Sequence, residues 1–267
     1  MAGTEFIHDL FGVEGRKVLI TGATQGLGAM MAEGFLKAGA AVWIVARKRP
    51  DIDATIARLS EFGSIGGICA DIATPEGIAT VAASLGEQTD ALDILINNAG
   101  TAWAAPIEEH GRDKFEKVVR LNLTTPYDLT RAMVPFLRAA SRPGEPSRVI
   151  NISSVAGMRA PDRDLFGYTS SKAGLHMLTQ NLAAALAPEI LVNCIAPGFF
   201  ESRMNAHFFD PDHPQFGTGP KVAPAGRYGQ PIDIMGAAIY LASPASQWLT
   251  GVILPVAGGS GTADGGS

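Results

Sequence analysis

The stretch KVLITGATQGLG, residues 17–28, places a short apolar run directly before three glycines and the start of a helical pattern. Gly22 allows a tight turn, Gly26 lets the backbone approach a ligand, and Gly28 permits close packing of the following helix. The free N–H groups at the start of that helix attract a diphosphate. The glycine spacing is GxxxGxG and not GxGxxG, and an ordinary glycine-containing turn is the alternative interpretation. The stretch therefore predicts a strand, a turn that binds phosphate, and a helix.

Six further short apolar runs follow, separated by segments with helical spacing. The expected strands are KVLIT (17–21), AVWIVA (41–46), IGGICA (65–70), LDILIN (92–97), SRVINIS (147–153), ILVNCIA (190–196) and VILPVA (252–257). Strands that alternate with helices are typical of βαβ units. We therefore expect an α/β fold with a doubly wound, seven-stranded parallel sheet flanked by helices. The segment 111–140 is expected to be helical, with Pro126 and Pro135 starting, kinking or ending helix there.

Length and composition predict a single domain. A chain of 267 residues with 46% hydrophobic and 18% charged residues can bury one large core. We expect an N-terminal extension at 1–15, one domain at 16–260, and a flexible Gly- and Ser-rich tail at 261–267. Prolines and histidines break any long regularity in residues 199–227, so this segment is expected to form an excursion that covers a ligand.

Charge and cysteine content argue against several classes of function. The formal net charge is −5, and no Lys/Arg block is long enough to neutralise nucleic acid. Cys69 and Cys194 lie in apolar runs and are expected to be small buried hydrophobes, not disulfide or zinc residues. The histidines lack metal-ligand spacing, so no metal is expected. The first residues show neither a signal peptide nor a membrane anchor, and a cytoplasmic protein is expected.

YTSSK, residues 168–172, places a phenol and an amine four residues apart. In a helix, Tyr168 and Lys172 lie on the same face with their Cβ atoms about 5 to 6 Å apart. A phenol with a pKa of about 10 exchanges protons poorly at neutral pH unless a neighbouring charge, such as an ammonium, stabilises its anion. Taken alone, the same spacing also fits a solvated lysine on a helix surface.

Several motifs occur in order along the chain: TGATQGLG, NNAG at 97–100, a serine in NISSVAG, YTSSK, and PG at 197–198. Together they resemble the short-chain dehydrogenase/reductase family, from about Arg16 to Gly259. The resemblance implies a Rossmann-type fold and an NAD(P)-dependent oxidoreductase.

The resemblance also implies catalytic roles. Tyr168 would donate its proton to a carbonyl oxygen as hydride arrives, and Lys172 would lower the Tyr168 pKa and bind the nicotinamide ribose. Ser154 would hold the substrate oxygen, with Ser153 as the competing choice. Asn122 would bend its helix and keep a water in a proton relay to Lys172. Without the other motifs, Asn122 would be interpreted as a helix-capping or surface amide.

The end of the second expected strand indicates the cofactor. Ala46 stands where an acid would bind the adenosine ribose of NAD, and Arg47 and Lys48 follow it, so NADP(H) is favoured over NAD(H). A solvated loop is the alternative, and Gln25 departs from the basic residue that many NADP-linked relatives carry there. The resemblance implies these cofactor-binding residues: Gly22, Thr24, Gln25, Gly26, Leu27, Gly28, Arg47, Lys48, Asp71, Ile72, Asn98, Ala99, Gly100, Tyr168, Lys172, Pro197, Gly198, Phe200 and Ser202.

Apolar side chains suggest a hydrophobic substrate pocket, although they would equally pack a lid or a subunit interface. They are Trp103, Phe199, Phe200, Met204, His207, Phe208 and Phe209. The stretches NNAGTAWAAPIE and ESRMNAH resemble bacterial 3-oxoacyl reductases, including the branch associated with rhamnolipid synthesis.

Three functions follow from these observations. The first is NADPH-dependent reduction of a 3-oxoacyl thioester or a similar apolar ketone. The second is NAD-dependent oxidation of a polyol, sugar or steroid alcohol, and the third is an inactive nucleotide-binding scaffold or sensor. A small carbonyl or alcohol substrate is expected, with no nucleic-acid or membrane partner. Relatives of this family commonly form tetramers, so a homotetramer or homodimer is expected.

Overall fold

A seven-stranded parallel sheet forms the centre of the molecule in the computed structural model, which describes residues 2–159, 164–200, 212 and 223–260. The strand order is β3-β2-β1-β4-β5-β6-β7, which confirms the doubly wound sheet. The strands are β1 Lys17–Thr21, β2 Ala41–Ala46, β3 Ile65–Cys69, β4 Ile94–Asn97, β5 Ser147–Ile152, β6 Ile190–Pro197 and β7 Ile253–Val256. Their ends lie within two residues of those expected.

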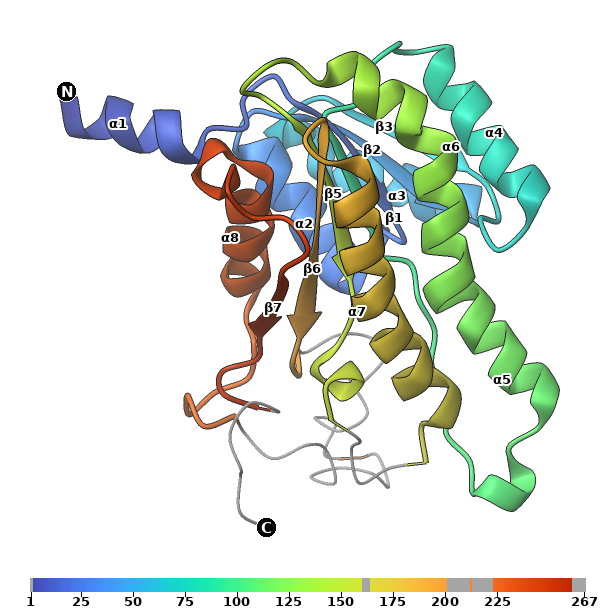
Figure 1. Ribbon diagram of the computed structural model, residues 1–267. Helices are drawn as coiled ribbons and strands as arrows, with labels where there is room; N and C mark the ends of the chain where they lie inside the picture. Colours follow the sequence, from blue (N-terminus) through green and yellow to red (C-terminus); the bar gives the residue numbers. More distant parts are fainter. Residues whose placement is uncertain (1, 160–163, 201–211, 213–222, 261–267) are drawn as a thin grey trace.

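Helices cover both faces of this sheet (Figure 1). The helices of the described residues are α1 Ala2–Phe11, α2 Gly26–Lys37, α3 Arg49–Leu59, α4 Pro75–Gly86, α5 Arg112–Val119, α6 Thr125–Ala140, α7 Phe166–Leu186 and α8 Pro231–Ala242. One hydrophobic cluster joins α2, α3 and α8 to the sheet, and a second joins α4, α6 and α7 to its other face. Helix α1 projects from the body of the molecule (Figure 1). Among the described residues, none of the helices has both the length and the apolar character needed to cross a bilayer.

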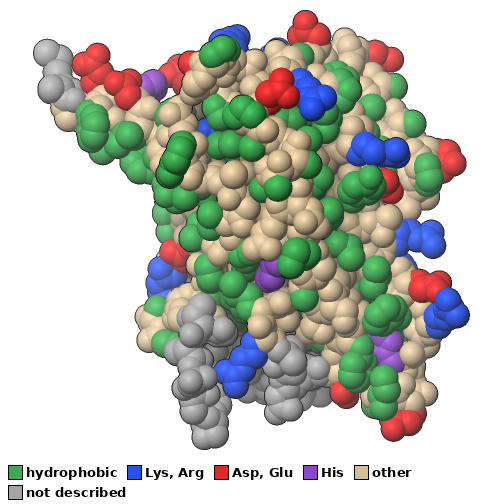
Figure 2. All heavy atoms as spheres, viewed as in Figure 1, with side chains coloured by type: hydrophobic (Ala, Val, Ile, Leu, Met, Phe, Trp, Pro, Cys, Tyr) green, Lys and Arg blue, Asp and Glu red, His purple; other side chains and the backbone are tan. Residues whose placement is uncertain are grey.

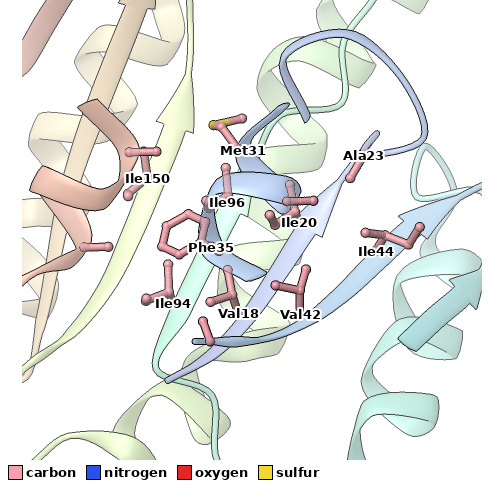
Figure 3. Packing of buried hydrophobic residues seen from close by; sticks show 14 of the residues in the cluster. Val18, Ile20, Ala23, Met31, Phe35, Val42, Ile44, Ile94, Ile96 and Ile150 are labelled. Atoms are coloured by element: carbon pink, nitrogen blue, oxygen red, sulfur yellow. The ribbon is translucent and has the colours of Figure 1, made fainter. Parts of the chain in front are cut away.

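Strand side chains alternate between the two clusters. In β1, Val18 and Ile20 belong to the first cluster, whereas Leu19 belongs to the second. Figure 3 shows Phe35 of α2 packed among Val18 and the other side chains of the first face. Both faces are buried because helices cover both, which explains why the strands are continuous apolar runs.

Two local expectations are refined by the fold. Pro126 lies in the first turn of α6, directly after the π-helical turn Arg120–Thr124, and Pro135 lies inside α6, which continues to Ala140. Cys194 is buried as expected, whereas Cys69 is exposed, so the expectation for Cys69 is wrong. Cys69 ends β3, an edge strand of the sheet, and is therefore covered on fewer sides than the end of a central strand.

Candidate active site

A crevice of about 2060 Å³ opens at the carboxyl ends of the strands. The strand order reverses between β1 and β4, where open parallel sheets bind their ligands. Most of the site residues expected from the sequence line it: Gly22, Thr24, Gln25, Gly26, Leu27, Arg47, Lys48, Asp71, Ile72, Asn98, Ala99, Gly100, Ser154, Tyr168, Lys172, Pro197, Gly198 and Phe200. Gly28 and Asn122 lie behind its wall, and Ser202 lies outside the described residues.

The turn between β1 and α2 brings backbone N–H groups to the crevice. Gly22 and Gly26 have φ values of 65° and 55°, a region that glycine enters without steric cost. Gln25 precedes α2, and its side chain makes no capping hydrogen bond. The first N–H groups of α2 therefore remain available to an anionic ligand. A Cβ on Gly28 would lie 2.5 Å from the Asn98 side chain, so Gly28 serves packing.

Thr21 and Asn98 lock this turn to the loop that follows β4. The Thr21 hydroxyl accepts hydrogen bonds from the backbone N–H groups of Asn98 and Ala99, both at 3.0 Å. The Asn98 amide donates in return to the carbonyls of Thr21 at 2.8 Å and Gly22 at 3.1 Å. The Asn98 side chain is therefore structural, and only its backbone and its neighbours face a ligand. The sequence analysis missed Thr21, although its place between the strand and Gly22 was a usable signal.

Tyr168 and Lys172 lie on one face of α7. The Lys172 ammonium nitrogen is 5.8 Å from the centre of the Tyr168 ring. Lys172 is only 4% exposed, and its ammonium donates to the Ile152 carbonyl at the end of β5 at 2.8 Å. The alternative of a solvated lysine is therefore wrong, because this amine is buried beside the crevice.

The two serines after β5 have different partners. The Ser153 hydroxyl donates to the Lys172 carbonyl at 3.0 Å and is committed to packing. The Ser154 hydroxyl accepts from the Ala156 N–H at 3.1 Å, and the Ser154 side chain acts on Tyr168 to lower its pKa. This difference favours Ser154 over Ser153 as the hydroxyl that a substrate oxygen meets.

Asn122 is fully buried in a π-helical turn, Arg120–Thr124, that joins α5 to α6. Its amide oxygen accepts from the Thr101 N–H at 2.9 Å, and its amide nitrogen donates to the Thr101 carbonyl at 2.9 Å. The same nitrogen donates to the Ser171 hydroxyl at 3.0 Å. The alternative of a capping or surface amide is therefore wrong, and Thr101 and Ser171 are partners that the sequence analysis did not identify.

Burial dominates the electrostatics of the pair. It raises the pKa of Tyr168, and the hydrogen bond with Ser154 opposes it only in part. Burial also lowers the pKa of Lys172 to about 8. The lowering of the Tyr168 pKa by Lys172 stays a prediction, because burial has the largest effect on this pKa and acts in the opposite direction. At neutral pH, Tyr168 is a protonated phenol and Lys172 is mostly cationic.

A pair of cations lines the crevice at the end of β2. Arg47 and Lys48 are both exposed, and neither belongs to an ion pair among the described residues. The neighbouring Arg49 differs, because its guanidinium binds the Asp53 carboxylate at 2.9 Å on α3. The unpaired charges of Arg47 and Lys48 are therefore available to an anionic group in the crevice.

The expected apolar pocket is only partly described. Phe199 and Phe200 line the crevice. Trp103 does not line it; this residue is 43% exposed, and the centre of its ring lies 5.5 Å from the Lys114 amine. Met204, His207, Phe208, Phe209 and most of the 199–227 excursion lie outside the described residues, as does the 261–267 tail.

Replacing Lys172 with methionine should change how stability depends on pH. The ordinary pKa of a lysine side chain is 10.5, and burial lowers the pKa of Lys172 to about 8 in the folded protein. Between these values the unfolded chain binds more protons, so the Lys172 contribution to the free energy of unfolding rises with pH. The wild type should gain stability relative to Lys172→Met as pH rises from about 8 to about 10.

Urea unfolding at several pH values measures this difference. Lys37→Met, at an exposed position of α2, is the control. Equal pH dependence in Lys172→Met and Lys37→Met would contradict the buried ammonium.

Comparison with known proteins identifies the family. Residues 16–212 match the family model for short chain dehydrogenases. The rhamnolipids biosynthesis 3-oxoacyl-[acyl-carrier-protein] reductase of Pseudomonas aeruginosa is 41% identical over 254 residues, which cover 95% of this chain and 99% of that protein. The solved RhlG/NADP active-site complex from Pseudomonas aeruginosa, also 41% identical, has a TM-score of 0.91 and covers 95% and 99% of the two chains. A gluconate 5-dehydrogenase from Burkholderia cenocepacia, solved with NADP and tartrate, is 32% identical, with a TM-score of 0.86 and coverage of 96% and 99%. The chain belongs to the short-chain dehydrogenase family and is an oxidoreductase.

Proposed function

We propose that this enzyme uses NADPH to reduce a 3-oxoacyl thioester or a similar apolar ketone. The observation that carries the proposal is the protonated phenol of Tyr168, which faces the crevice beside Ser154 and the buried Lys172 ammonium. Similarity to a 3-oxoacyl reductase along nearly the whole chain supports the substrate class. Phe199 and Phe200 supply apolar lining.

The residues present fit a dinucleotide phosphate. The start of α2 offers uncapped N–H groups, and a Cβ on Gly22 would lie 2.9 Å from Ala99, so only glycine leaves this cradle open. Arg47 and Lys48 would bind the 2′-phosphate through charge-assisted hydrogen bonds, and Ala46 offers no carboxylate to repel it. Asp71, Ile72 and the Asn98–Gly100 wall would hold the adenosine, and Pro197, Gly198 and Phe200 the nicotinamide.

The proposed chemistry rests on hydroxyl groups and one cation. Bound NADPH would supply the hydride for the carbonyl carbon. The hydroxyls of Ser154 and Tyr168 would hold the carbonyl oxygen, and Tyr168 would transfer its proton to that oxygen. The Lys172 ammonium would stabilise the phenolate that remains. Asn122 would hold the π-helical turn that lies beside the Lys172 ammonium.

A dehydrogenase of a sugar acid is the second candidate, because the gluconate 5-dehydrogenase relative covers nearly the whole chain. Its polar substrate would need hydrogen-bond partners, whereas a 3-oxoacyl chain needs apolar lining.

An assay of several carbonyl substrates distinguishes these two candidate functions. We expect acetoacetyl and longer 3-oxoacyl thioesters to consume NADPH faster than 5-ketogluconate does, measured by NADPH absorbance. Faster reduction of 5-ketogluconate would reverse the order of the candidates.

We also propose that the enzyme forms a homotetramer. A homotetramer would pair α6 and α7, and separately α8 and β7, between copies. Exposed apolar side chains on these helices support such contacts, namely Tyr127, Met177 and Ile232. Figure 2 also shows hydrophobic side chains along α1 and the face beside it. Light scattering measures the assembly.

Both cysteines are free, which is in keeping with a cytoplasmic enzyme.

Tyr168→Phe should abolish turnover and keep NADPH binding, because the substitution removes only the proton donor. We expect kcat to fall by about 10²–10⁴-fold, the range for loss of an acid–base group. Fluorescence titration measures the retained NADPH affinity. Tyr127→Phe, on the exposed side of α6, is the matched control. Unaltered turnover in Tyr168→Phe would falsify the assigned proton donor.

Arg47→Ala should weaken NADPH much more than NADH. Loss of a hydrogen bond to an ionised group costs roughly 1.5–3 kcal/mol, so the KM for NADPH should rise by about tenfold or more. The KM for NADH should change little, because NADH lacks the 2′-phosphate. Arg49→Ala removes an adjacent guanidinium that pairs with Asp53 and is the control. An equal rise for both cofactors would remove the argument for NADP(H).

A further inference from the structure

Ser171 connects two parts of the site that the sequence motifs leave separate. It is 1% exposed and directly precedes Lys172 on α7. Its hydroxyl donates to the Tyr168 carbonyl at 2.7 Å and accepts from the Asn122 amide nitrogen at 3.0 Å. The direction of both bonds is fixed, because a carbonyl only accepts and an amide NH₂ only donates. Both sides of this buried hydroxyl are therefore occupied.

Asn122 continues the connection to the wall of the crevice. Its amide pairs twice with the Thr101 backbone, and this pairing fixes which end of the amide is nitrogen. Gly100 lies against the same group, because a Cβ on it would be 3.2 Å from the Asn122 amide oxygen and 3.6 Å from the Lys172 nitrogen. A continuous chain of hydrogen bonds thus runs from the wall at Thr101 through Asn122 and Ser171 to the turn of Tyr168.

Hydroxyl groups in helices often bond the carbonyl three or four residues before them, and that habit alone implies no function. Thr169 does so, toward Leu165 at 3.1 Å. Ser171 differs from Thr169 because it also accepts a bond from another element. Thr179 shares the two-sided pattern, since it donates to Leu175 and accepts from the Asn151 amide at 2.9 Å. Thr179 lies two turns further along α7 and is the matched comparison.

We propose that Ser171 is a positioning residue, which holds the Tyr168–Lys172 turn in place relative to the crevice wall at Gly100 and Thr101. It would act through Asn122 and would touch neither substrate nor cofactor. The inference rests on the proposed roles of Tyr168 and Lys172. It predicts an effect on the chemical step, because a small displacement of the phenol misplaces the proton donor while the phosphate contacts of the crevice remain.

Ser171→Ala tests this role against Thr179→Val. We expect Ser171→Ala to lower kcat about tenfold, equivalent to about 1.4 kcal/mol, and to change the Kd for NADPH by less than about twofold. Thr179→Val removes an equally buried two-sided hydroxyl, so it should lower the urea midpoint comparably and leave kcat within about twofold of wild type. Ser171→Cys keeps the shape of the side chain but replaces the hydroxyl with a thiol, a weak donor and acceptor. It should also lower kcat, and it is measured in parallel in case alanine lowers the folded fraction.

A double-mutant cycle with Asn122→Ala gives the second readout. If Ser171 acts through Asn122, the double variant should be little slower than Asn122→Ala alone. Multiplicative effects on kcat, or equal losses in the Ser171 and Thr179 variants, would overturn the proposal. The assay uses whichever ketone the wild type reduces fastest. The Ser171 test therefore does not depend on whether the preferred substrate is a 3-oxoacyl thioester.

Discussion

The reciprocal hydrogen bonds between Thr21 and Asn98 tie the glycine turn after β1 to the loop after β4, beside the ladder that joins these two strands. The Thr21 hydroxyl accepts from the backbone N–H groups of Asn98 and Ala99, and the Asn98 amide donates to the carbonyls of Thr21 and Gly22. These bonds lie at the point where the strand order reverses. Separation of the two segments would leave several enclosed polar groups without partners, which is costly. The uncapped start of α2 therefore lies directly against the wall after β4, where a Cβ on Gly28 would be 2.5 Å from the Asn98 side chain.

Burial then decides the chemistry at the other side of the crevice. Lys172 lies on α7 against the end of β5, where its ammonium donates to the Ile152 carbonyl, and burial lowers its pKa to about 8. The same enclosure raises the pKa of Tyr168 and keeps the phenol protonated. A protonated phenol beside a cation fits proton donation to a reduced carbonyl. The reverse reaction would first have to remove that proton.

Polar groups also fix the register of the central elements. The Asn97 amide donates to Asn151 on the neighbouring strand at 2.9 Å and to Thr130 of α6 at 3.0 Å. Asn151 in turn donates to Thr179 of α7. These side chains are buried and bonded across four elements, so sliding of β4 or β5 would break two of these bonds, and sliding of α6 or α7 would break one.

The sequence by itself determined the alternation of strands and helices, the glycine turn after β1, and the shared helix face of Tyr168 and Lys172. These depend on local periodicity and on residues a few positions apart. Only the tertiary structure decided that Asn122 is buried, that Cys69 and Trp103 are exposed, and that Thr21 and Ser171 hydrogen-bond to distant segments of the chain. Thr21 and Asn98 are 77 positions apart, and Asn122 and Ser171 are 49 apart. Burial and pairing over such separations follow from how the elements pack, because the partner of a polar group is whichever side chain the fold brings beside it.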